Sequence, residues 1–417
     1  MQIDLQQFSA PCSCGKPHTI SVKGIWIEPG ALDRLPQLIQ KNHWTKPVIV
    51  CDDNTKSAAG SRATELLPSS TMICLPSKGL HADEHGVALA KEKLLESDVL
   101  IAVGSGTIHD LTRYIAHEKK LPFLSVPTAA SVDGFVSTVA AMTWNGCKKT
   151  FPAVAPMYVL ADSEIFSRAP QQLTISGVCD LLGKYTALAD WRIGHAVTGE
   201  YFCQTVCNME YAALEEVKSH LDEIQKGGQQ ACEALMYGLL LSGLAMQMVG
   251  NSRPASGAEH HLSHLWEMEL VNPPIDAYHG EKVGVGLLLA ARKYQSVMRY
   301  FESEVPTPKS WTGIELELIK AHAFGKKREG LLQENTPDPL AAIDLKTLNA
   351  KIPKILEILE DIPSEEQLST MMESVGAKRN MSDIGLEQQL EEVSLRLSPY
   401  VRNRLTFMRL MKLWGLN

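Results

Sequence analysis

Three histidines, His260, His261 and His264, lie within five positions of one another in the stretch GAEHHLSHLW. Imidazole nitrogens are common metal ligands, so a cluster of this kind could hold a divalent ion. If the stretch is helical, residues four apart share a face, so His260 and His264 project together and His261 points about 100° away. Helical geometry therefore separates His261 from the pair but leaves open which of the other two binds a metal.

Two further residues could complete a metal site. His279 stands at the start of a predicted helix in DAYHGEKVGVG, and Asp180 lies among apolar neighbours in SGVCDLLGKYTALADW. A carboxylate in such a setting needs a partner, because burying an unpaired charge is costly. A metal ion is one such partner, and Lys184, one turn later, is another. One Asp and two His with an open coordination position are typical of a catalytic divalent ion that acts as a Lewis acid.

A glycine turn, VGSGTIHD, follows one predicted strand and opens a predicted helix. Backbone N–H groups and the helix dipole at such a turn favour a phosphate. The turn is not the full dinucleotide fingerprint, because His109 stands where the third glycine would be, and it is not a Walker A loop, because no Gly-Lys-Ser/Thr follows. Taken alone it is a weak sign of nucleotide binding, since plain strand-to-helix turns use similar glycines.

Two carboxylates, Asp52 and Asp53, end the predicted strand in VIVCDDN. A carboxylate at this end of a strand can accept hydrogen bonds from ribose hydroxyls and would repel a 2′-phosphate. A nicotinamide cofactor bound here would therefore be NAD in preference to NADP. The alternative is a solvated loop carboxylate with no role in binding.

The elements that must position these residues change character along the chain. Strands are predicted at 46–54, 71–77, 98–106 and 121–128, and helices at 84–97 and 107–120. This alternation indicates βαβ units and a parallel sheet. After about Pro170 a 3.6-residue period dominates, and helices joined by polar loops are expected, the clearest loop being 326–342. We predict an α/β dinucleotide-binding domain over 1–168 and an all-helical metal- and substrate-binding domain over 169–417.

Composition limits the partners and the location. A chain of 417 residues exceeds the roughly 250–300 that one core supports, which agrees with two domains. A net charge of −8 argues against nucleic acid or an anionic membrane as a partner. The start of the chain lacks the features of a secretory signal, and the apolar run 234–250, interrupted by Ser242 and Gln247, predicts a buried core helix. We expect a cytoplasmic protein that does not insert into membranes.

Nine cysteines, an odd and scattered set, indicate reduced thiols. Cys12, Cys14 and His18 in APCSCGKPHTI are arranged like half of a zinc knuckle. The spacing is C-x-C instead of C-x₂-C, and no second Cys/His pair follows at zinc-finger spacing. An N-terminal hairpin with a glycine turn is the favoured interpretation, and a structural metal is the alternative.

Several strings together resemble the sn-glycerol-1-phosphate dehydrogenases, especially their bacterial AraM-type branch. They are VGSGTIHDLTRY, SVPTAASVDGFVS, GVCDLLGKYTALADW, GNSRPASGAEHHLSH and YHGEKVGVG, with CSCGKPH near the start and SPYVRNRLTFMRL near the end. The resemblance covers nearly the whole chain and is least distinctive over 300–390. SRPASGAEH with HGEKVGVG is quite specific, whereas the glycine turn is shared with the wider superfamily of glycerol dehydrogenases, iron-type alcohol dehydrogenases and dehydroquinate synthases.

The resemblance implies a dehydroquinate synthase-like fold, in which a Rossmann-like domain precedes a helical metal domain. It implies that Asp180, His260 and His279 are the metal ligands and that His264 faces the substrate or supports the ligands. Asp133 matches a residue that meets the substrate hydroxyls. The positions expected to bind the cofactor, with the two strand-end carboxylates included, are Asp52, Asp53, Gly104, Ser105, Gly106, Thr107, Asp110, Thr128 and Ser131.

Neighbouring families differ from this pattern at single positions. Iron-type alcohol dehydrogenases carry a fourth ligand, a His four residues after the Asp, where this chain has Lys184. A three-ligand zinc or nickel site therefore fits better than ferrous iron. Dehydroquinate synthases use Glu where this chain has Asp180. Plain glycerol dehydrogenases share the Asp-His-His set but not SRPASGAEH.

The predicted activity is the NAD(P)-dependent interconversion of dihydroxyacetone phosphate and sn-glycerol 1-phosphate. The metal would polarise the C2 carbonyl, while Asp133 and His264 would orient hydroxyls or relay the proton. The substrate phosphate needs cationic or N–H donors. The options are Arg253, Lys184 and Lys148 or Lys149. The family also suggests a homodimer. A dehydrogenase of unphosphorylated glycerol or another polyol is the alternative, and a non-catalytic nucleotide-binding relative is a second one.

Overall fold

The computed structural model describes residues 3–304 and 306–416, and the chain divides into two compact units. The first unit comprises Met1–Trp144, Lys148–Leu181 and Asn208–Asn251, and the second comprises Asn145–Cys147, Leu182–Cys207 and Ser252–Asn417. The units are therefore not the two continuous stretches, 1–168 and 169–417, expected from the sequence. Compactness follows packing, and helices from 171–181 and 208–249 pack with the strands although they follow them in the chain.

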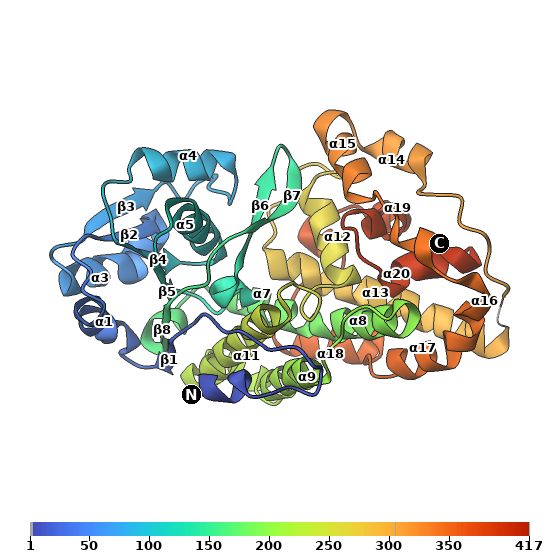
Figure 1. Ribbon diagram of the computed structural model, residues 1–417, viewed down its shortest axis with the longest axis horizontal. Helices are drawn as coiled ribbons and strands as arrows, with labels where there is room; N and C mark the ends of the chain where they lie inside the picture. Colours follow the sequence, from blue (N-terminus) through green and yellow to red (C-terminus); the bar gives the residue numbers. More distant parts are fainter. Residues whose placement is uncertain (1–2, 305, 417) are drawn as a thin grey trace. The chain divides into compact units, whose positions relative to one another are not determined.

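The first unit is built on a six-stranded sheet in the order β1-β8-β5-β4-β2-β3, and all its strand pairs are parallel (Figure 1). The strands are β1 Gly24–Glu28, β2 Pro47–Asp52, β3 Thr71–Leu75, β4 Val99–Gly104, β5 Phe123–Pro127 and β8 Tyr158–Asp162. The four strands predicted from the sequence are confirmed as β2, β3, β4 and β5. The short strands β1 and β8 were not predicted.

Helices cover both faces of this sheet because alternate residues of its strands face two apolar clusters. In β2, Ile49 and Cys51 belong to one cluster, and Val48 and Val50 belong to the other. The helices of the first cluster are α1 Leu35–Lys41, α3 Ser61–Leu66 and α6 Ser163–Phe166, and those of the second are α4 Glu84–Glu92 and α5 Gly106–Lys119. A strand buried on both faces is apolar at every position, which is why VIV appeared as a continuous run in the sequence.

Helix α11 (Gln229–Val249) is the core helix of the first unit. It is long and apolar enough to cross a membrane by composition, yet 83% of its most apolar window is buried inside the structure. The predicted buried core helix is therefore confirmed. The other helices of this unit are α2 Asp53–Thr55, α7 Gln171–Leu182, α10 Leu221–Gln225 and the larger part of α9 Gln204–Lys218.

The prediction of an N-terminal hairpin is wrong. The N-terminal hairpin is absent, because Gly15 forms a turn with its N–H donating to the Cys12 carbonyl (3.1 Å) but no strand flanks it before Gly24 among the described residues. A hairpin forms elsewhere, from β6 (Val139–Trp144) and β7 (Cys147–Pro152). The Asn-Gly pair between them has positive φ angles of 52° and 72°, as a two-residue hairpin turn requires.

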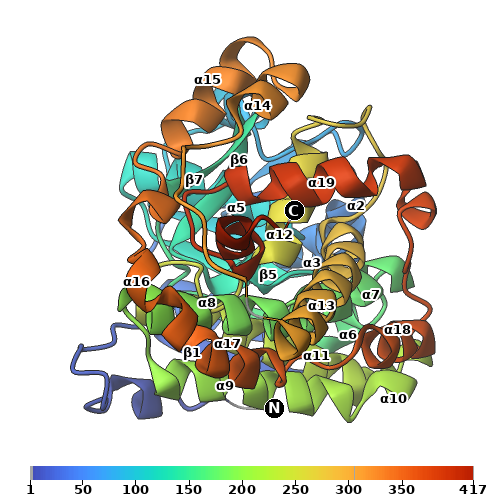
Figure 2. The ribbon, with the colours of Figure 1, turned by 90° about the vertical axis from the view of Figure 1, so that its right-hand side faces the viewer.

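The second unit is helical. Among the residues that the structure describes, no strand follows Asp162. Its long helix α13 lies along α12 and packs against α17 and α18 (Figure 2). The helices are α8 Lys184–Thr198, α12 Ala258–Glu267, α13 His279–Ser303, α14 Leu316–His322, α15 Gly325–Glu334, α16 Leu345–Leu348, α17 Ile352–Leu359, α18 Glu365–Ser374, α19 Glu391–Leu397 and α20 Phe407–Leu410.

Helix α15 corrects the predicted loop at 326–342. Its sequence, GKKREGLLQE, is mostly polar, but Leu331 is buried in the apolar cluster of the second unit. Burial of one face outweighs a composition that by itself suggests a loop. The rest of the predicted helical character after residue 170 is confirmed.

His109 links the glycine turn to the sheet. Its Nδ1–H donates to the Ser105 carbonyl (3.0 Å), and Nε2 accepts from the Ser125 hydroxyl (2.7 Å). Burial, and then the neighbouring Arg113 guanidinium, lower the pKa of His109 to about 3. The ring therefore takes the place of a third glycine as a neutral, fully bonded group that holds α5 against β5.

Replacing His109 with Gln should make the stability of the protein less sensitive to acid. An unfolded chain protonates this ring near pH 6.5 and the folded chain only near pH 3, so stability falls as the pH drops from about 6.5 towards 3. Denaturant unfolding at a series of pH values should give a shallower loss for His109→Gln than for the wild type. His117→Gln, exposed on the same helix, is the control. Equal pH dependence of His109→Gln and the wild type would contradict this account.

Candidate active site

The glycine turn and the acidic strand end lie at the carboxyl edge of the parallel sheet. Val50 of β2 pairs with Ala102 of β4, two residues before Asp52 and Gly104 respectively. β2 lies between β3 and β4 in the sheet. The chain continues from β2 to the edge strand β3 and then crosses to β4 on the opposite side of β2, so the strand order reverses between β2 and β4. Nucleotides bind at such reversal points in open parallel sheets. The fold of the first unit therefore provides the position that the sequence predicted for a cofactor.

Close packing explains the two glycines of the turn. A Cβ on Gly104 would lie 2.6 Å from the Cβ of Ile108, and a Cβ on Gly106 would lie 3.2 Å from the side chain of Val132. Ser105 is the N-cap residue of α5 and its side chain makes no capping hydrogen bond, which leaves the first N–H groups of the helix, from Gly106 and Thr107 onward, able to meet an anion.

The two strand-end carboxylates have different surroundings. Asp52 caps the next helix, since its Oδ1 accepts from the Thr55 N–H (2.8 Å). Asp53 is exposed, and its Oδ2 accepts from the Ser77 N–H (3.1 Å). Asp53 is thus the one with more of its surface open to a ribose.

Asp133 and Asp180 come together within the first unit. The backbone N–H of Asp133 donates to Asp180 Oδ2 (3.1 Å), and Asp180 is 1% exposed. Oδ2 of Asp133 lies 3.0 Å from the hydroxyl of Ser242, which also lies 3.1 Å from Glu210 Oε1. Both predicted acidic site residues are therefore held in place by hydrogen bonds.

Two polar residues of α11 support the segment that carries Asp133. Ser242 reaches Asp133 directly, and the Gln247 side chain donates to the carbonyl of Val136, in the short 3₁₀ helix η4 (Asp133–Val136). In the sequence, both residues stand out only as interruptions of an apolar run. Their signal was that a polar group in an apolar helix needs a partner inside the fold.

The remaining predicted residues of the first unit lie around the turn. The N–H of Thr128 donates to the Gly104 carbonyl (3.1 Å), so the end of β5 is tied to the turn. Ser131 is buried, and its carbonyl accepts from the Ser176 hydroxyl (3.4 Å). Asp110, on α5, lies 3.5 Å from Arg113 Nη1.

The second unit brings three histidines together. His260 and His264 lie one turn apart on α12, and His279 is the first residue of α13. The ring centroids of His260 and His279 are 5.4 Å apart, those of His264 and His279 are 5.8 Å apart, and those of His260 and His264 are 6.0 Å apart. The convergence of the pair on α12 with His279 is therefore observed.

His261 lies in different surroundings. It is 1% exposed, and neither ring nitrogen has a hydrogen-bond partner among the described residues. Burial, and then the charges of Arg404 and Arg402, hold its pKa well below the usual value. A neutral ring beside arginines has no part in the histidine cluster, as the helical spacing predicted.

Two carboxylates that the sequence analysis missed orient the histidines. His260 Nδ1 donates to Glu259 Oε1 (2.7 Å), and His279 Nδ1 donates to Glu267 Oε1 (2.9 Å). A carboxylate accepts only, so each Nδ1 carries the hydrogen and each Nε2 keeps its lone pair. This is the arrangement found behind metal-bound histidines in proteins. Glu259 directly precedes His260 in the sequence, which was the available signal.

Another possible set of metal ligands lies within the second unit. One donor atom from each of His264, Glu267 and His279 lies within 4.8 Å of the others. Glu267 is 3.2 Å from Lys282 Nζ as well as bonded to His279, so its charge already has two partners. The donor chemistry of these three side chains fits a divalent ion.

The cationic residues proposed for a substrate phosphate differ in their hydrogen bonds and in their burial. Arg253 Nε donates to Glu200 Oε2 (3.1 Å) and Nη1 donates to the Leu405 carbonyl (2.9 Å). Lys184 is fully buried, and Lys149 is exposed on β7. Lys148, beside it, is partly buried. A phosphate at Arg253 would have to share the guanidinium with Glu200.

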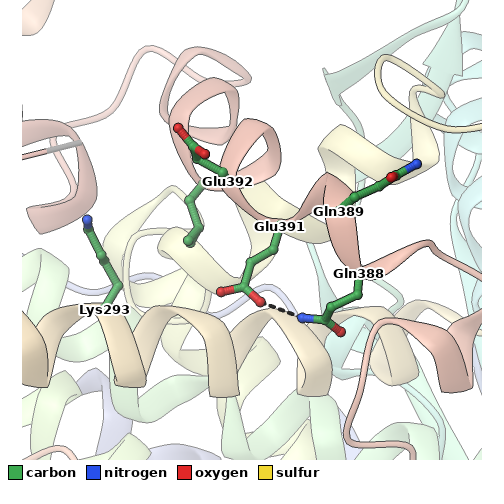
Figure 3. A pocket seen from close by; sticks show the side chains of 6 residues that line it. Lys293, Gln388, Gln389, Glu391 and Glu392 are labelled. Atoms are coloured by element: carbon green, nitrogen blue, oxygen red, sulfur yellow. Dashed lines mark hydrogen bonds between the residues drawn. The ribbon is translucent and has the colours of Figure 1, made fainter.

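A surface hollow in the second unit lies on α13 and α19 (Figure 3). Its lining carries no histidine, and Gln388 donates to Glu391 across it (2.6 Å). The residues that line it are Lys293, Gln388, Gln389, Glu391, Glu392 and Leu395. None of them is a predicted site residue.

The chain is similar in sequence to a known family and to several known proteins. Residues 26–170 match the family model of the iron-containing alcohol dehydrogenases. The chain is 35% identical to a glycerol-1-phosphate dehydrogenase (NAD(P)+) of Geobacillus stearothermophilus, over 95% of this chain and 94% of the relative. It is 33% identical to the enzyme of that name from Halalkalibacterium halodurans, over 97% and 96%.

Solved structures share the fold at low identity. A maleylacetate reductase from Agrobacterium tumefaciens matches with a TM-score of 0.63 at 15% identity, covering 94% of this chain and 92% of that one. A glycerol dehydrogenase from Schizosaccharomyces pombe matches with a TM-score of 0.54 at 19% identity, covering 91% and 93%. These likenesses confirm the predicted dehydroquinate synthase-like fold class and say nothing further of activity.

Replacing Glu259 with Gln should weaken retention of a divalent metal by about 10–100-fold, because the amide no longer fixes the His260 tautomer as a carboxylate does. Metal competition with a chelator measures this. Glu281→Gln is the matched control, since Glu281 is also buried but accepts from Tyr278 N–H and Lys378 instead of a histidine. Equal metal retention in Glu259→Gln and Glu281→Gln would show that the Glu259 bond does not serve a metal ligand.

Proposed function

The chain belongs to the glycerol-1-phosphate dehydrogenase family, and from this membership we propose that it interconverts dihydroxyacetone phosphate and sn-glycerol 1-phosphate with NAD(P)H. In the reducing direction a hydride passes from the nicotinamide to C2 of the ketone, and a proton passes to its oxygen. The observation that carries the proposal is the pair of imidazoles, His260 and His279, each fixed by a carboxylate so that Nε2 is available.

We assign Asp180, His260 and His279 as the ligands of one divalent ion, zinc or nickel. An ion bound there supplies Lewis-acid polarisation of the substrate carbonyl. The two carboxylate bonds support the histidines, and the N–H of Asp133 supports one oxygen of Asp180. Lys184, at the position of the fourth ligand of iron-type enzymes, argues against ferrous iron.

Asp133 and His264 are assigned to the substrate. Asp133 is partly exposed and is anchored through Ser242, so its carboxylate can accept from the hydroxyl groups of the substrate without drifting. His264 is partly exposed, and its ring lies beside that of His279. A histidine there can deliver the proton that the alkoxide oxygen needs, because its usual pKa is near neutrality.

The cofactor is assigned to the carboxyl edge of the sheet. The pyrophosphate meets the turn at Gly104–Thr107, with Asp110 on the helix behind it, and Thr128 and Ser131 lie towards the nicotinamide. A ribose meets Asp53 or Asp52, which favours NAD over NADP because a carboxylate repels a 2′-phosphate. The reversal of strand order between β2 and β4 supports this placement.

Three further assignments concern the site of the substrate phosphate, the cellular compartment and the oligomeric state. We assign the phosphate to a cationic group among Lys184, Arg253 and the Lys148–Lys149 pair. None of the nine cysteines forms a disulfide, which supports a reducing compartment such as the cytoplasm. The family resemblance supports a homodimer.

His260→Ala and His264→Ala should separate ligand from substrate residue. His260→Ala should lose one bound divalent ion per chain together with turnover, because it removes a ligand. His264→Ala should keep that ion and lose turnover, because it removes a proton donor. Elemental analysis after gel filtration, with NADH oxidation on the same samples, measures both. If His264→Ala loses the ion and His260→Ala keeps it, the ligands are His264, Glu267 and His279.

The substrate assignment predicts that NADH oxidation is much faster with dihydroxyacetone phosphate than with dihydroxyacetone. A site that binds the phosphate loses charge-assisted hydrogen bonds when that group is missing. The product should resist a dehydrogenase specific for sn-glycerol 3-phosphate, which reports its configuration. Preference for dihydroxyacetone would indicate a polyol dehydrogenase, and no oxidation with either compound would indicate a non-catalytic protein.

A further inference from the structure

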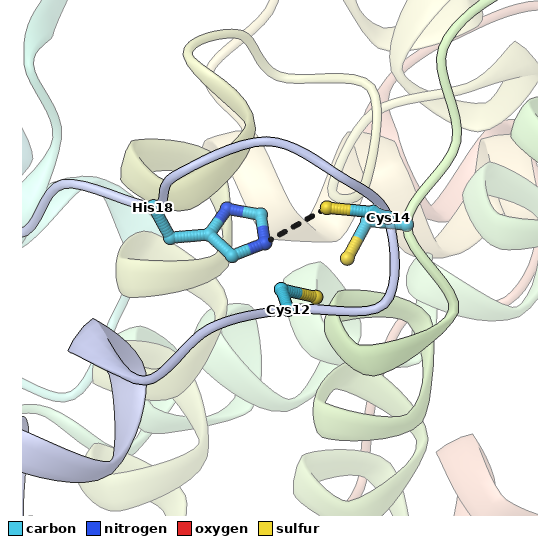
Figure 4. Close-up of side chains that lie close together, drawn as sticks. Cys12, Cys14 and His18 are labelled. Atoms are coloured by element: carbon cyan, nitrogen blue, oxygen red, sulfur yellow. Dashed lines mark hydrogen bonds between the residues drawn. The ribbon is translucent and has the colours of Figure 1, made fainter.

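We propose that Cys12, Cys14 and His18 bind a structural zinc ion, in addition to the ion assigned to Asp180, His260 and His279. The three residues lie in the N-terminal segment before β1, in a loop that the activity does not use. Figure 4 shows Cys12 and Cys14 on one bend of this loop with the ring of His18 facing them. We call these three residues the N-terminal knuckle.

The donor atoms of the knuckle lie close together, and one separation among them is that of two ligands on one ion. Cys14 Sγ lies 3.4 Å from His18 Nε2, and the donor atoms of the three residues all lie within 4.8 Å of one another. In a tetrahedral zinc site with bonds of about 2.3 Å to sulfur and 2.0–2.1 Å to nitrogen, a sulfur and a nitrogen are about 3.6 Å apart. The Cys14–His18 separation is close to that value.

His18 presents the correct nitrogen to the thiols. Its Nδ1 lies 2.7 Å from the carbonyl oxygen of Met248, at the end of α11, and a carbonyl accepts only. Nδ1 therefore carries the hydrogen, and Nε2 directs its lone pair towards Cys14. The ring is 8% exposed, so it is fixed in this orientation. His260 and His279 are prepared in the same way by their carboxylates.

The turn brings the two thiols to one side. Gly15 has a φ of +76°, a conformation that glycine adopts without strain, and its N–H donates to the Cys12 carbonyl (3.1 Å). The chain thus reverses direction directly after Cys14, which is what a C-x-C pair needs in place of the longer C-x₂-C spacing. Two thiolates and one imidazole suit zinc, and a further ligand or a water completes the tetrahedron.

A metal in the knuckle would stabilise the support of Asp133. The segment after His18 is joined to α11 by the Ser21 N–H, which donates to Gln247 Oε1 (3.0 Å). The amide of the same Gln247 donates to the carbonyl of Val136, in the 3₁₀ helix that begins at Asp133. Zinc therefore holds the N-terminal segment against the end of α11 that carries Gln247.

Elemental analysis of the purified full chain tests the proposal. The wild type should bind two divalent ions per chain, and the double variant Cys12→Ser/Cys14→Ser should bind one. His260→Ala should also bind one, retained in the knuckle. Cys74→Ser is the control, since Cys74 is half-buried like the knuckle cysteines but lies on β3, and it should bind two. A wild type with one ion that the double variant retains would overturn the proposal.

Cobalt substitution gives a second readout that does not require the double variant to fold. The ligand set Asp180, His260 and His279 contains no sulfur, so thiolate-to-cobalt charge-transfer absorption reports the knuckle alone. The absorption should appear in the cobalt-loaded wild type and persist in His260→Ala. Its absence from both proteins would overturn the proposal, as would a disulfide between Cys12 and Cys14 in the purified chain. Neither readout depends on turnover, so an inactive enzyme would leave this test unaffected.

Discussion

Two hydrogen bonds between imidazoles and carboxylates orient the histidines of the helical unit. A neutral histidine has two tautomers. A hydrogen-bond acceptor at one ring nitrogen keeps the hydrogen on that nitrogen and leaves the lone pair on the other. Glu259 and Glu267 make that choice for His260 and His279. Glu259 is buried, which opposes its ionisation, but hydrogen bonds from His260, Thr186 and the Gly257 N–H hold its pKa below the usual value. The carboxylate therefore stays charged and keeps the ring of His260 oriented.

The start of α12 is held by a second buried carboxylate. Asp190, on α8, accepts from the N–H of Ala258 (2.8 Å), the N–H of Phe407 (2.7 Å) and the hydroxyl of Tyr294 (2.9 Å). Burial, and then the charge of Glu259, raise its pKa to about 7. Two carboxylates in one buried region thus have different ionisation, and the one that orients the histidine is the one that keeps its charge. The hydrogen bonds to Asp190 lower its pKa and so offset part of this difference, but burial outweighs them.

Much of the fold and of the site could be predicted from the sequence. Strands β2, β3, β4 and β5 were predictable because their apolar runs end at turns, whereas β1 and β8, although as long as β3 and β5, were not recognised. Helix α11 was predicted as buried, but the roles of Ser242 and Gln247 were not, because a polar residue in an apolar helix shows that it needs a partner without showing which. Glu259 and Glu267 were missed because a glutamate near a histidine in the sequence does not show that the two side chains form a hydrogen bond. His260 could not be separated from His264, since residues four apart share a helix face.

Anomalous diffraction at the absorption edge of the bound metal, on crystals of the holoenzyme, tests the central claim most directly. The account predicts a peak about 2.0–2.1 Å from Nε2 of both His260 and His279, with an oxygen of Asp180 beside it and His264 outside bonding distance. A peak bonded to His264 and Glu267, or to Nδ1 of either proposed ligand, would contradict it.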